Sequence, residues 1–203
     1  DSAGTIVWTK QLGSTGSDVA YGVAVDSNNN VYITGYTTGA LDGTSAGSLD
    51  AFLAKYDSVG TKEWTKQLGT TGTDVAYSVV VDSSNNVYIT GYTVGNLGGI
   101  NAGNDDAFLA KYDSAGTIVW TKQLGSTGSD TAWGVAVDSN NNVYITGFTT
   151  GDLDGSGNGG SDAFLTKYSM LNTIEGYVPT VTTTEPVIVV DDLLSVGVLT
   201  VGT

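Results

Sequence analysis

The stretch Asp50-Ala51-Phe52-Leu53-Ala54-Lys55-Tyr56-Asp57 is the first of three nearly identical stretches in this chain. It recurs 56 residues later from Asp106, and again 56 residues after that from Asp162, where Thr166 replaces one alanine and Ser169 replaces the final aspartate. The same spacing relates the three tryptophans Trp8, Trp64 and Trp120. Self-similarity at one fixed period predicts a repeat architecture, in which neighbouring units bury each other's apolar faces.

The composition favours many short strands. The 203 residues include 29 glycines, and β-branched and aromatic residues alternate with clusters of Gly, Asn, Ser and Asp. Such a mixture is typical of strands joined by tight turns. With 40% hydrophobic and 14% charged residues, the chain is expected to be globular.

Charge and missing residue types argue against several classes of function. The net charge is −14 and every cation is a lysine, so we expect no binding to nucleic-acid phosphates. The chain has no cysteine and no histidine, which removes disulfides, thiolate metal sites and the usual general base. We therefore expect no enzyme and no organic cofactor. No apolar run is long enough to span a bilayer, so we expect no membrane insertion.

Each repeat contains four segments with the pattern of β-strands. In the first repeat these segments are Thr5–Leu12, Val19–Val25, Val31–Thr37 and Ala51–Tyr56. Four antiparallel strands with two partly apolar faces make up a β-propeller blade, which cannot bury both faces alone. We predict an all-β fold of three tandem four-stranded antiparallel blades, and an open stacked array is the alternative to a ring.

Recurring aromatic residues have two interpretations. The tryptophans, together with Tyr32, Tyr88 and Tyr144, could form platforms for sugar rings, but their alternating strand positions favour packing between blades. A further position, occupied by Tyr21, Tyr77 and Trp133, is large in every copy and is predicted to lie in the core.

Recurring acidic residues are predicted to be structural. Asp26, Asp82 and Asp138 keep the repeat spacing, as do Asp18, Asp74 and Asp130. They could form a ring of ligand-binding carboxylates, but recurrence in every copy favours side chains that cap turns.

A calcium site is the one metal site that the sequence suggests. Calcium prefers oxygen ligands, and its candidate ligands here are Asp152, Asp154 and Asp162 in and after a glycine-rich loop. The matching segment of the preceding repeat, Asn96-Leu97-Gly98-Gly99, lacks the first two acids. Solvated turn residues are therefore the alternative.

The repeat resembles a known family. The elements that carry the resemblance are Asp-Ala-Phe-Leu-Ala-Lys-Tyr-Asp-Ser-x-Gly, then Trp-Thr-Lys-Gln-Leu-Gly, then Val-Asp-Ser-x-Asn-Asn-Val-Tyr-Ile-Thr-Gly-Tyr-Thr, in fixed order over residues 1–168. This unit is similar to the bacterial SBBP β-propeller repeat. The resemblance implies a propeller-type fold in an extracellular or cell-surface bacterial protein, and it supplies no catalytic residues.

The periodic pattern fails after the third copy. We expect a three-repeat domain over 1–168, a degenerate fourth-repeat strand over 169–178 with Gly176 at the tryptophan position, and an extended β tail over 179–203. Because Asp1 aligns with a repeat boundary, we expect the chain to be a trimmed product of a longer precursor.

The near-identity of the outer repeats suggests self-assembly. Residues 1–39 and 113–151 differ at three positions, so their strands should be interchangeable. We predict a structural extracellular protein whose copies share β-strands in a filament or ring. The residues expected to mediate assembly are Thr5, Ile6, Val7 and Trp8, and in the tail Val187, Ile188, Val189, Val190, Leu199 and Val201.

Two alternatives remain open at this point. One is a module that binds a surface glycan through loop residues such as Asp152 and Asn158. The other is a fragment of a larger propeller whose remaining blades lie in the precursor. In both cases strand exchange between copies would not be needed.

Overall fold

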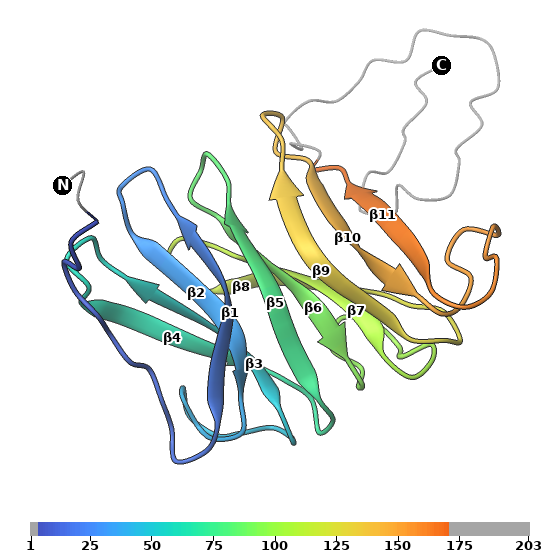
Figure 1. Cartoon of the computed structure of the whole chain (residues 1–203), viewed down its shortest axis with the longest axis horizontal. Helices are drawn as coiled ribbons and strands as arrows, with labels where there is room; N and C mark the ends of the chain where they lie inside the picture. The colour runs from blue at the N-terminus through green and yellow to red at the C-terminus, as the bar shows by residue number, and fades with distance from the viewer. Residues whose placement is uncertain (1–3, 171–203) are drawn as a thin grey trace, which may run out of the picture. The chain divides into compact units, whose positions relative to one another are not determined.

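The computed structural model describes residues 4–170, and within that range it contains eleven β-strands and no helix (Figure 1). The strands fall within one compact unit, Asp1–Met170. They are β1 (Asp18–Val25), β2 (Val31–Thr37), β3 (Asp50–Tyr56), β4 (Lys62–Leu68), β5 (Asp74–Val81), β6 (Val87–Thr93), β7 (Asp106–Tyr112), β8 (Ile118–Leu124), β9 (Asp130–Val137), β10 (Val143–Thr149) and β11 (Asp162–Tyr168). The all-β prediction is confirmed.

The strands form three antiparallel sheets, which we call blades 1, 2 and 3. Blade 1 has the order β1-β2-β3-β4, blade 2 the order β5-β6-β7-β8, and blade 3 has the three strands β9-β10-β11 among the described residues. Each blade takes its first three strands from one repeat, whereas the fourth is the tryptophan-bearing strand of the next repeat. The boundary of a blade is therefore offset from the boundary of a repeat.

The predicted strand Thr5–Leu12 does not form. Residues 4–17 contain no strand, and the side chains of Ile6 and Val7 are 81% and 86% exposed. The matching residues of the next two repeats form β4 and β8, which pair with β3 and β7 of the preceding blade. β4 and β8 thus each form beside the third strand of a preceding blade, and the described residues include no blade before blade 1.

The hydrophobic core lies between the blades. Leu53 and Tyr32 of blade 1 pack with Ile89 and Phe108 of blade 2. Leu109 and its neighbours on blade 2 pack in the same way against blade 3. Blade 2 is thus covered on both faces, as the alternation of apolar residues requires.

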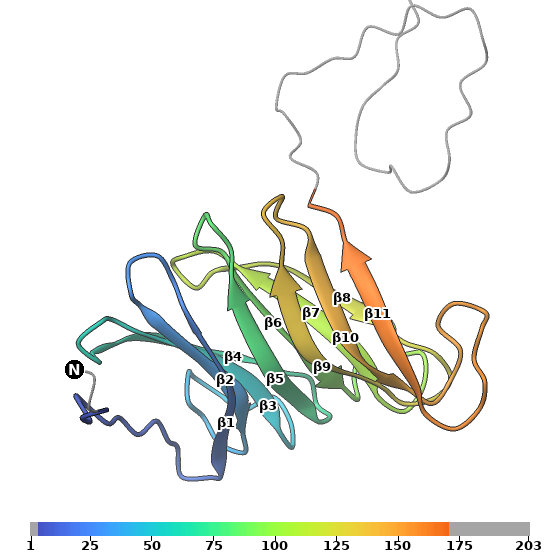
Figure 2. The same ribbon diagram turned by 45° about the horizontal axis from the view of Figure 1, so that its top comes forward.

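The first strands of the blades, β1, β5 and β9, lie side by side (Figures 1 and 2). Gly22 permits this approach, because a Cβ atom there would lie 3.1 Å from the Cα of Ser78 on β5. In the next pair, the backbone N–H of Val135 donates to the Ser78 hydroxyl at 3.3 Å. The small residues of these strands therefore set the spacing of the blades.

The core prediction for Tyr21 and Trp133 is wrong. Their side chains are 51% and 58% exposed, whereas Tyr77 between them is half-buried. Each residue is the extra one in a β-bulge, for example between Ala20 and Gly22 of β1. A bulge takes one residue out of the alternation that the sequence pattern assumes, and the side chain then leaves the buried face.

The recurring aspartates cap turns, as predicted. Asp26 accepts hydrogen bonds from the backbone N–H groups of Asn28 (2.8 Å) and Asn30 (2.9 Å), from the Asn30 amide (2.8 Å) and from the Tyr32 hydroxyl (3.1 Å). Asn29 takes the left-handed conformation that the turn needs, with φ of 62°. Asp82 and Asp138 repeat this arrangement.

Candidate functional site

The open edge of blade 3 is the feature that distinguishes this blade from the others. β3 and β7 each lie between two strands, whereas β11 pairs only with β10 among the described residues. The exposure of the leucine at the centre of each of these strands differs accordingly. Leu53 and Leu109 are fully buried, whereas Leu165 is 73% exposed. Among residues 4–170, blade 3 therefore presents both an unpaired strand edge and an uncovered face.

In blade 1 the outer strand is joined to the glycine-rich loop by the side chain of Gln67. Its Nε2 donates to the carbonyl of Gly39 at 3.0 Å and to the carboxylate of Asp50 at 2.7 Å. Its Oε1 accepts from the backbone N–H groups of Leu41 at 2.9 Å and Asp42 at 3.4 Å. One amide thus satisfies a loop, a buried carboxylate and the neighbouring strand together. We call this arrangement the glutamine latch.

Blade 2 has the same glutamine latch. Gln123 donates to the carbonyl of Gly95 at 3.0 Å and to the carboxylate of Asp106 at 2.8 Å. It accepts from the backbone N–H groups of Leu97 at 3.0 Å and Gly98 at 3.1 Å. Asp50 and Asp106 are both fully buried, and in each the amide donates to one carboxylate oxygen, Oδ2, while Oδ1 has no protein partner.

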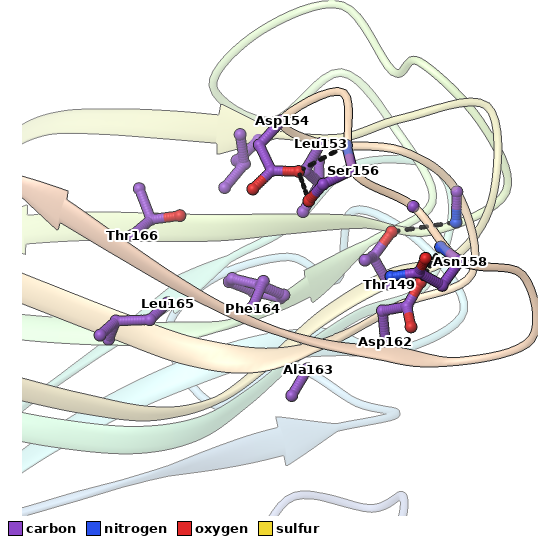
Figure 3. A pocket seen from close by; sticks show the side chains of 13 residues that line it. Thr149, Leu153, Asp154, Ser156, Asn158, Asp162, Ala163, Phe164, Leu165 and Thr166 are labelled. Carbon is purple, nitrogen blue, oxygen red and sulfur yellow. Dashed lines mark hydrogen bonds between the residues drawn. The ribbon is translucent and has the colours of Figure 1, made fainter.

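Blade 3 has the loop without the latch. The residue that follows Gln123 by one repeat is Pro179, which has no amide side chain and no backbone N–H. The matching loop begins at Gly151 and runs through Leu153 to Asp162. Beside it lies a hollow of about 430 Å³ (Figure 3). Its lining includes Leu153, Asp154, Asn158, Asp162, Phe164 and Thr166.

Trp64 and Trp120 pack against the cores between blades, as the sequence favoured, and each also contacts a tyrosine of its own blade. The ring of Trp64 lies 6.0 Å from that of Tyr32, and Trp120 lies 6.1 Å from Tyr88, centroid to centroid. In blade 3 the corresponding tyrosine is Tyr144, and the residue at the tryptophan position of the following segment is Gly176. Blade 3 therefore has the tyrosine half of this pair but no tryptophan after it.

The predicted assembly residues that the structure describes, Thr5, Ile6, Val7 and Trp8, belong to a segment at the opposite end of the three blades from β11. Figures 1 and 2 place the segment that contains Ile6, Val7 and Trp8 beside blade 1. The tail residues Val187, Ile188, Val189, Val190, Leu199 and Val201 lie outside the described residues, as do residues 171–178 of the degenerate strand. Sequence reasoning missed the glutamines, although Gln11, Gln67 and Gln123 keep the repeat spacing.

The candidate calcium ligands are engaged within their own loop. The carboxylate of Asp152 accepts from the backbone N–H of Gly155 at 2.6 Å, that of Asp154 from Ser156 at 3.0 Å, and that of Asp162 from Asn158 at 2.9 Å. Residues 4–170 contain no cluster of three or more acidic side chains suited to a metal ion. Calcium binding stays a prediction. Over the same residues, no helix has the length and apolarity needed to cross a membrane.

Comparison with known proteins supports the architecture. The sequence profile of the SBBP beta-propeller repeat matches residues 7–41, 63–98 and 119–154, together more than half of the chain. An uncharacterized WD repeat-containing protein of Acanthamoeba polyphaga mimivirus is 26% identical over 201 residues, covering 78% of this chain and 14% of its own length. The regulatory protein FlaEY of Caulobacter vibrioides is 30% identical over 183 residues, covering 80% and 19%.

The chain thus spans less than a fifth of the length of either relative. The three profile matches coincide with the three 56-residue copies, and the structure folds these copies into stacked antiparallel blades. The chain belongs to the SBBP family of beta-propeller repeat proteins.

Proposed function

We propose that this chain is a non-enzymatic structural protein of the bacterial surface or exterior, whose copies assemble by sharing β-strands. One observation carries the proposal. Blade 3 is one strand short among the described residues, and the chain carries an unused copy of the missing strand sequence at its other end. An unpaired edge with an apolar face is a template for a further chain.

The two end faces of the three-blade unit are complementary. Blade 3 exposes Leu165, whose counterparts in blades 1 and 2 are buried against the next blade. Blade 1 exposes Val23, which is 67% accessible, whereas its counterpart Val79 of blade 2 is 7% accessible because blade 1 covers it. A head-to-tail contact between two copies would repeat the packing already present between blades 1 and 2.

A head-to-tail contact is heterologous, so its product depends on the angle between copies. If the rotation closes, the product is a ring, and two copies of three blades would give six, within the range of about four to eight that closed propellers adopt. If the rotation does not close, the product is a filament. Both outcomes use the same pair of end faces.

The proposal is tested by the mass of the native particle and by one matched pair of variants. Leu165→Asp places a charge on the end face of blade 3, whereas Ile100→Asp places one on a loop residue that is 86% exposed. We expect particles larger than one chain for the unmodified protein and for Ile100→Asp, and single chains for Leu165→Asp. A monomeric unmodified protein would refute the proposal. Deleting residues 179–203 tests the predicted role of the tail in assembly. An unchanged number of chains per particle would contradict that role.

A specific observation supports glycan binding as a second candidate function. Tyr21 and Trp133 are half-exposed on the first strands of blades 1 and 3, and the rings of Tyr21 and Tyr77 lie 5.1 Å apart. Exposed aromatic faces stack on the apolar faces of sugar rings. Binding of the unmodified chain to a glycan array, lost in the Trp133→Ala variant, would support this function. Failure of the unmodified chain to bind any glycan on the array would contradict it.

A further inference from the structure

We propose that the fourth strand of blade 3 is the segment Thr5–Leu12 of a second copy of this chain, and that Gln11 of that segment is the residue that locks it. The inference rests on the proposed function and deepens it, because it names the donor strand, its register and the residue that decides specificity. Four observations support it: the register of the existing blades, the vacant latch, the packing of the donor segment and the sequence that follows blade 3.

The register follows from the two complete blades. In blade 1, Leu53 lies opposite Lys66 and Ala54 lies opposite Thr65, and blade 2 repeats this pairing one repeat later. When the donor strand is shifted back by one repeat and the acceptor strand is shifted forward by two repeats, Thr9 lies opposite Thr166. The same shift places Gln11 opposite Phe164, since Gln67 lies opposite Phe52.

Gln11 fits the vacant latch of blade 3. The acceptor groups of the latch are the carbonyl of Gly151 and the carboxylate of Asp162, and its donor is the N–H of Leu153, in the places that Gly39, Asp50 and Leu41 hold in blade 1. Asp162 already accepts from the N–H of Asn158 at 2.9 Å, as Asp50 accepts from Ala46 at 2.7 Å. Gly151, Leu153 and Asp162 line the hollow of Figure 3. In blade 1 the side chain of Gln67 occupies the corresponding place.

The donor segment is already held against its own blade 1. Leu12 packs with Phe52 and Tyr56. A Cβ atom at Gly60 would lie 3.0 Å from the ring of Trp8, the same distance that separates a Cβ atom at Gly116 from the ring of Trp64. Trp8 and Leu12 therefore lie on the following blade as Trp64 and Leu68 of β4 do, although residues 4–17 are not part of a strand. A preorganised strand loses less entropy when it binds.

Trp8 would complete a second contact in the acceptor. Tyr144 of blade 3 keeps the setting of Tyr32, because its hydroxyl donates to Asp138 at 3.0 Å and the ammonium of Lys167 lies 5.5 Å from its ring. In the proposed register Trp8 lies opposite Lys167, as Trp64 lies opposite Lys55. Trp8 would therefore pack on Tyr144 as Trp64 packs on Tyr32.

The donor belongs to a second copy for two reasons. Among the described residues of one chain, the segment and β11 lie at opposite ends of the three blades (Figures 1 and 2). The chain's own continuation after β11 has Gly176 at the tryptophan position and Pro179 at the glutamine position. The residue types at these two repeat-equivalent positions therefore differ from the tryptophan and glutamine of blades 1 and 2.

The register is tested by cross-linking two single-cysteine variants, because the chain contains no native cysteine. Thr9→Cys and Thr166→Cys chains are mixed and oxidised, and a covalent dimer is expected because facing residues of paired strands have Cβ atoms about 5 Å apart. The control mixes Thr9→Cys with Ala163→Cys, about 10 Å out of register, and should give no dimer.

The cross-linking outcomes separate this inference from the proposed function. Assembly of the unmodified chain without a Thr9–Thr166 dimer would overturn the donor assignment and leave assembly standing. An unmodified chain that stays monomeric would overturn both. A disulfide formed within one chain would also overturn the assignment to a second copy.

The role of Gln11 is tested by self-association of full-length variants. Gln11→Ala should weaken association at least tenfold, and Gln11→Glu should weaken it further because two carboxylates would meet at Asp162. Ile100→Ala, at a loop residue that is 86% exposed, is the control and should change association less than twofold. Hydrogen exchange of residues 151–158 should slow on assembly of the unmodified chain but not with Gln11→Ala. Association and exchange that are insensitive to Gln11→Ala would overturn its role.

Discussion

Gln67 donates a hydrogen bond of 2.7 Å to the fully buried carboxylate of Asp50, and this contact joins the last strand of blade 1 to the strand before it. The two residues come from different repeats, so the bond joins one repeat to the next. Blades 1 and 2 both depend on this link between repeats, because the fourth strand of each comes from the following repeat of the same chain.

The first prediction concerns the stability of this latch. Gln67→Ala leaves a buried carboxylate and two loop N–H groups without the amide, and we expect the free energy of unfolding to fall by about 2 kcal/mol. Gln11→Ala is the matched control, because the same residue type there has no latch in the isolated subunit. Urea unfolding of the monomer measures both, and equal losses would contradict the interpretation.

The second prediction compares two equivalent leucines. Leu53 is fully buried and Leu165 is 73% exposed. Leu53→Ala should lower the free energy of unfolding by about 3 kcal/mol because it opens a cavity between blades, whereas Leu165→Ala should change it by less than about 0.5 kcal/mol in the monomer. Denaturant unfolding at protein concentrations that keep the chain monomeric measures the difference. A large effect of Leu165→Ala under those conditions would show that its face is already covered.

The third prediction concerns Gly91, at the centre of blade 2. A Cβ atom there would lie 1.8 Å from the carbonyl oxygen of Val75 on the paired strand, where the bulge brings the two backbones together. Gly91→Ala should therefore destabilise the fold by about 3 kcal/mol or more, since backbone atoms must move. At Gly13 the nearest atom would lie 3.5 Å away, so Gly13→Ala should be nearly neutral. Thermal unfolding of the two variants tests the contrast.

The fourth prediction concerns acid. Burial pushes the pKa of Asp26 upward, but hydrogen bonds from Asn30, Asn28 and Tyr32 outweigh burial and hold the pKa below the ordinary value of 3.8. In Asp138 the hydrogen bond from the Asn142 side chain is the largest cause of a similarly lowered pKa. A lowered pKa in the folded state stabilises the fold fully above pH 3.8, and this contribution is lost as the pH falls through the folded value.

Stability should therefore be nearly constant from pH 5 to 7 and should fall below about pH 4. Asp26→Asn removes one of these titrating groups, so the variant should be less stable at pH 7 and lose less on acidification. Melting temperatures between pH 2 and pH 7 measure both slopes. Parallel curves for the variant and the unmodified chain would contradict the assignment.

Much of the fold could be predicted from the sequence, because its strongest signal is local and repeated. The segment Val31–Thr37 forms β2 with the predicted bounds, and the segment predicted from Ala51 forms β3 one residue earlier, from Asp50. The turn at Asp26 also follows its sequence pattern, since its hydrogen bonds join residues at most six apart. Contacts of this kind depend on neighbours in the chain, which are visible in the sequence.

The errors arose where a residue's environment depends on a distant strand. Tyr21 and Trp133 have the pattern of core positions, but pairing across a bulge exposes them. Thr5–Leu12 has the composition of β4 and β8, yet residues 4–17 contain no strand, whereas β4 and β8 form beside β3 and β7. The glutamine latch joins residues up to 28 apart, so the repeated glutamine alone did not reveal it.

The sequence by itself therefore determined the repeat, the strands and the blade architecture, since the 56-residue period and its alternation of apolar residues dictate which faces are buried. Only the tertiary structure decided how strands are distributed among blades, and hence that blade 3 has three strands within the described residues while the matching segment lies beside blade 1. The physical reason is that identical sequences fold alike only where identical partners surround them. Leu53 and Leu165 are the same residue in the same motif, and the next blade covers one and not the other.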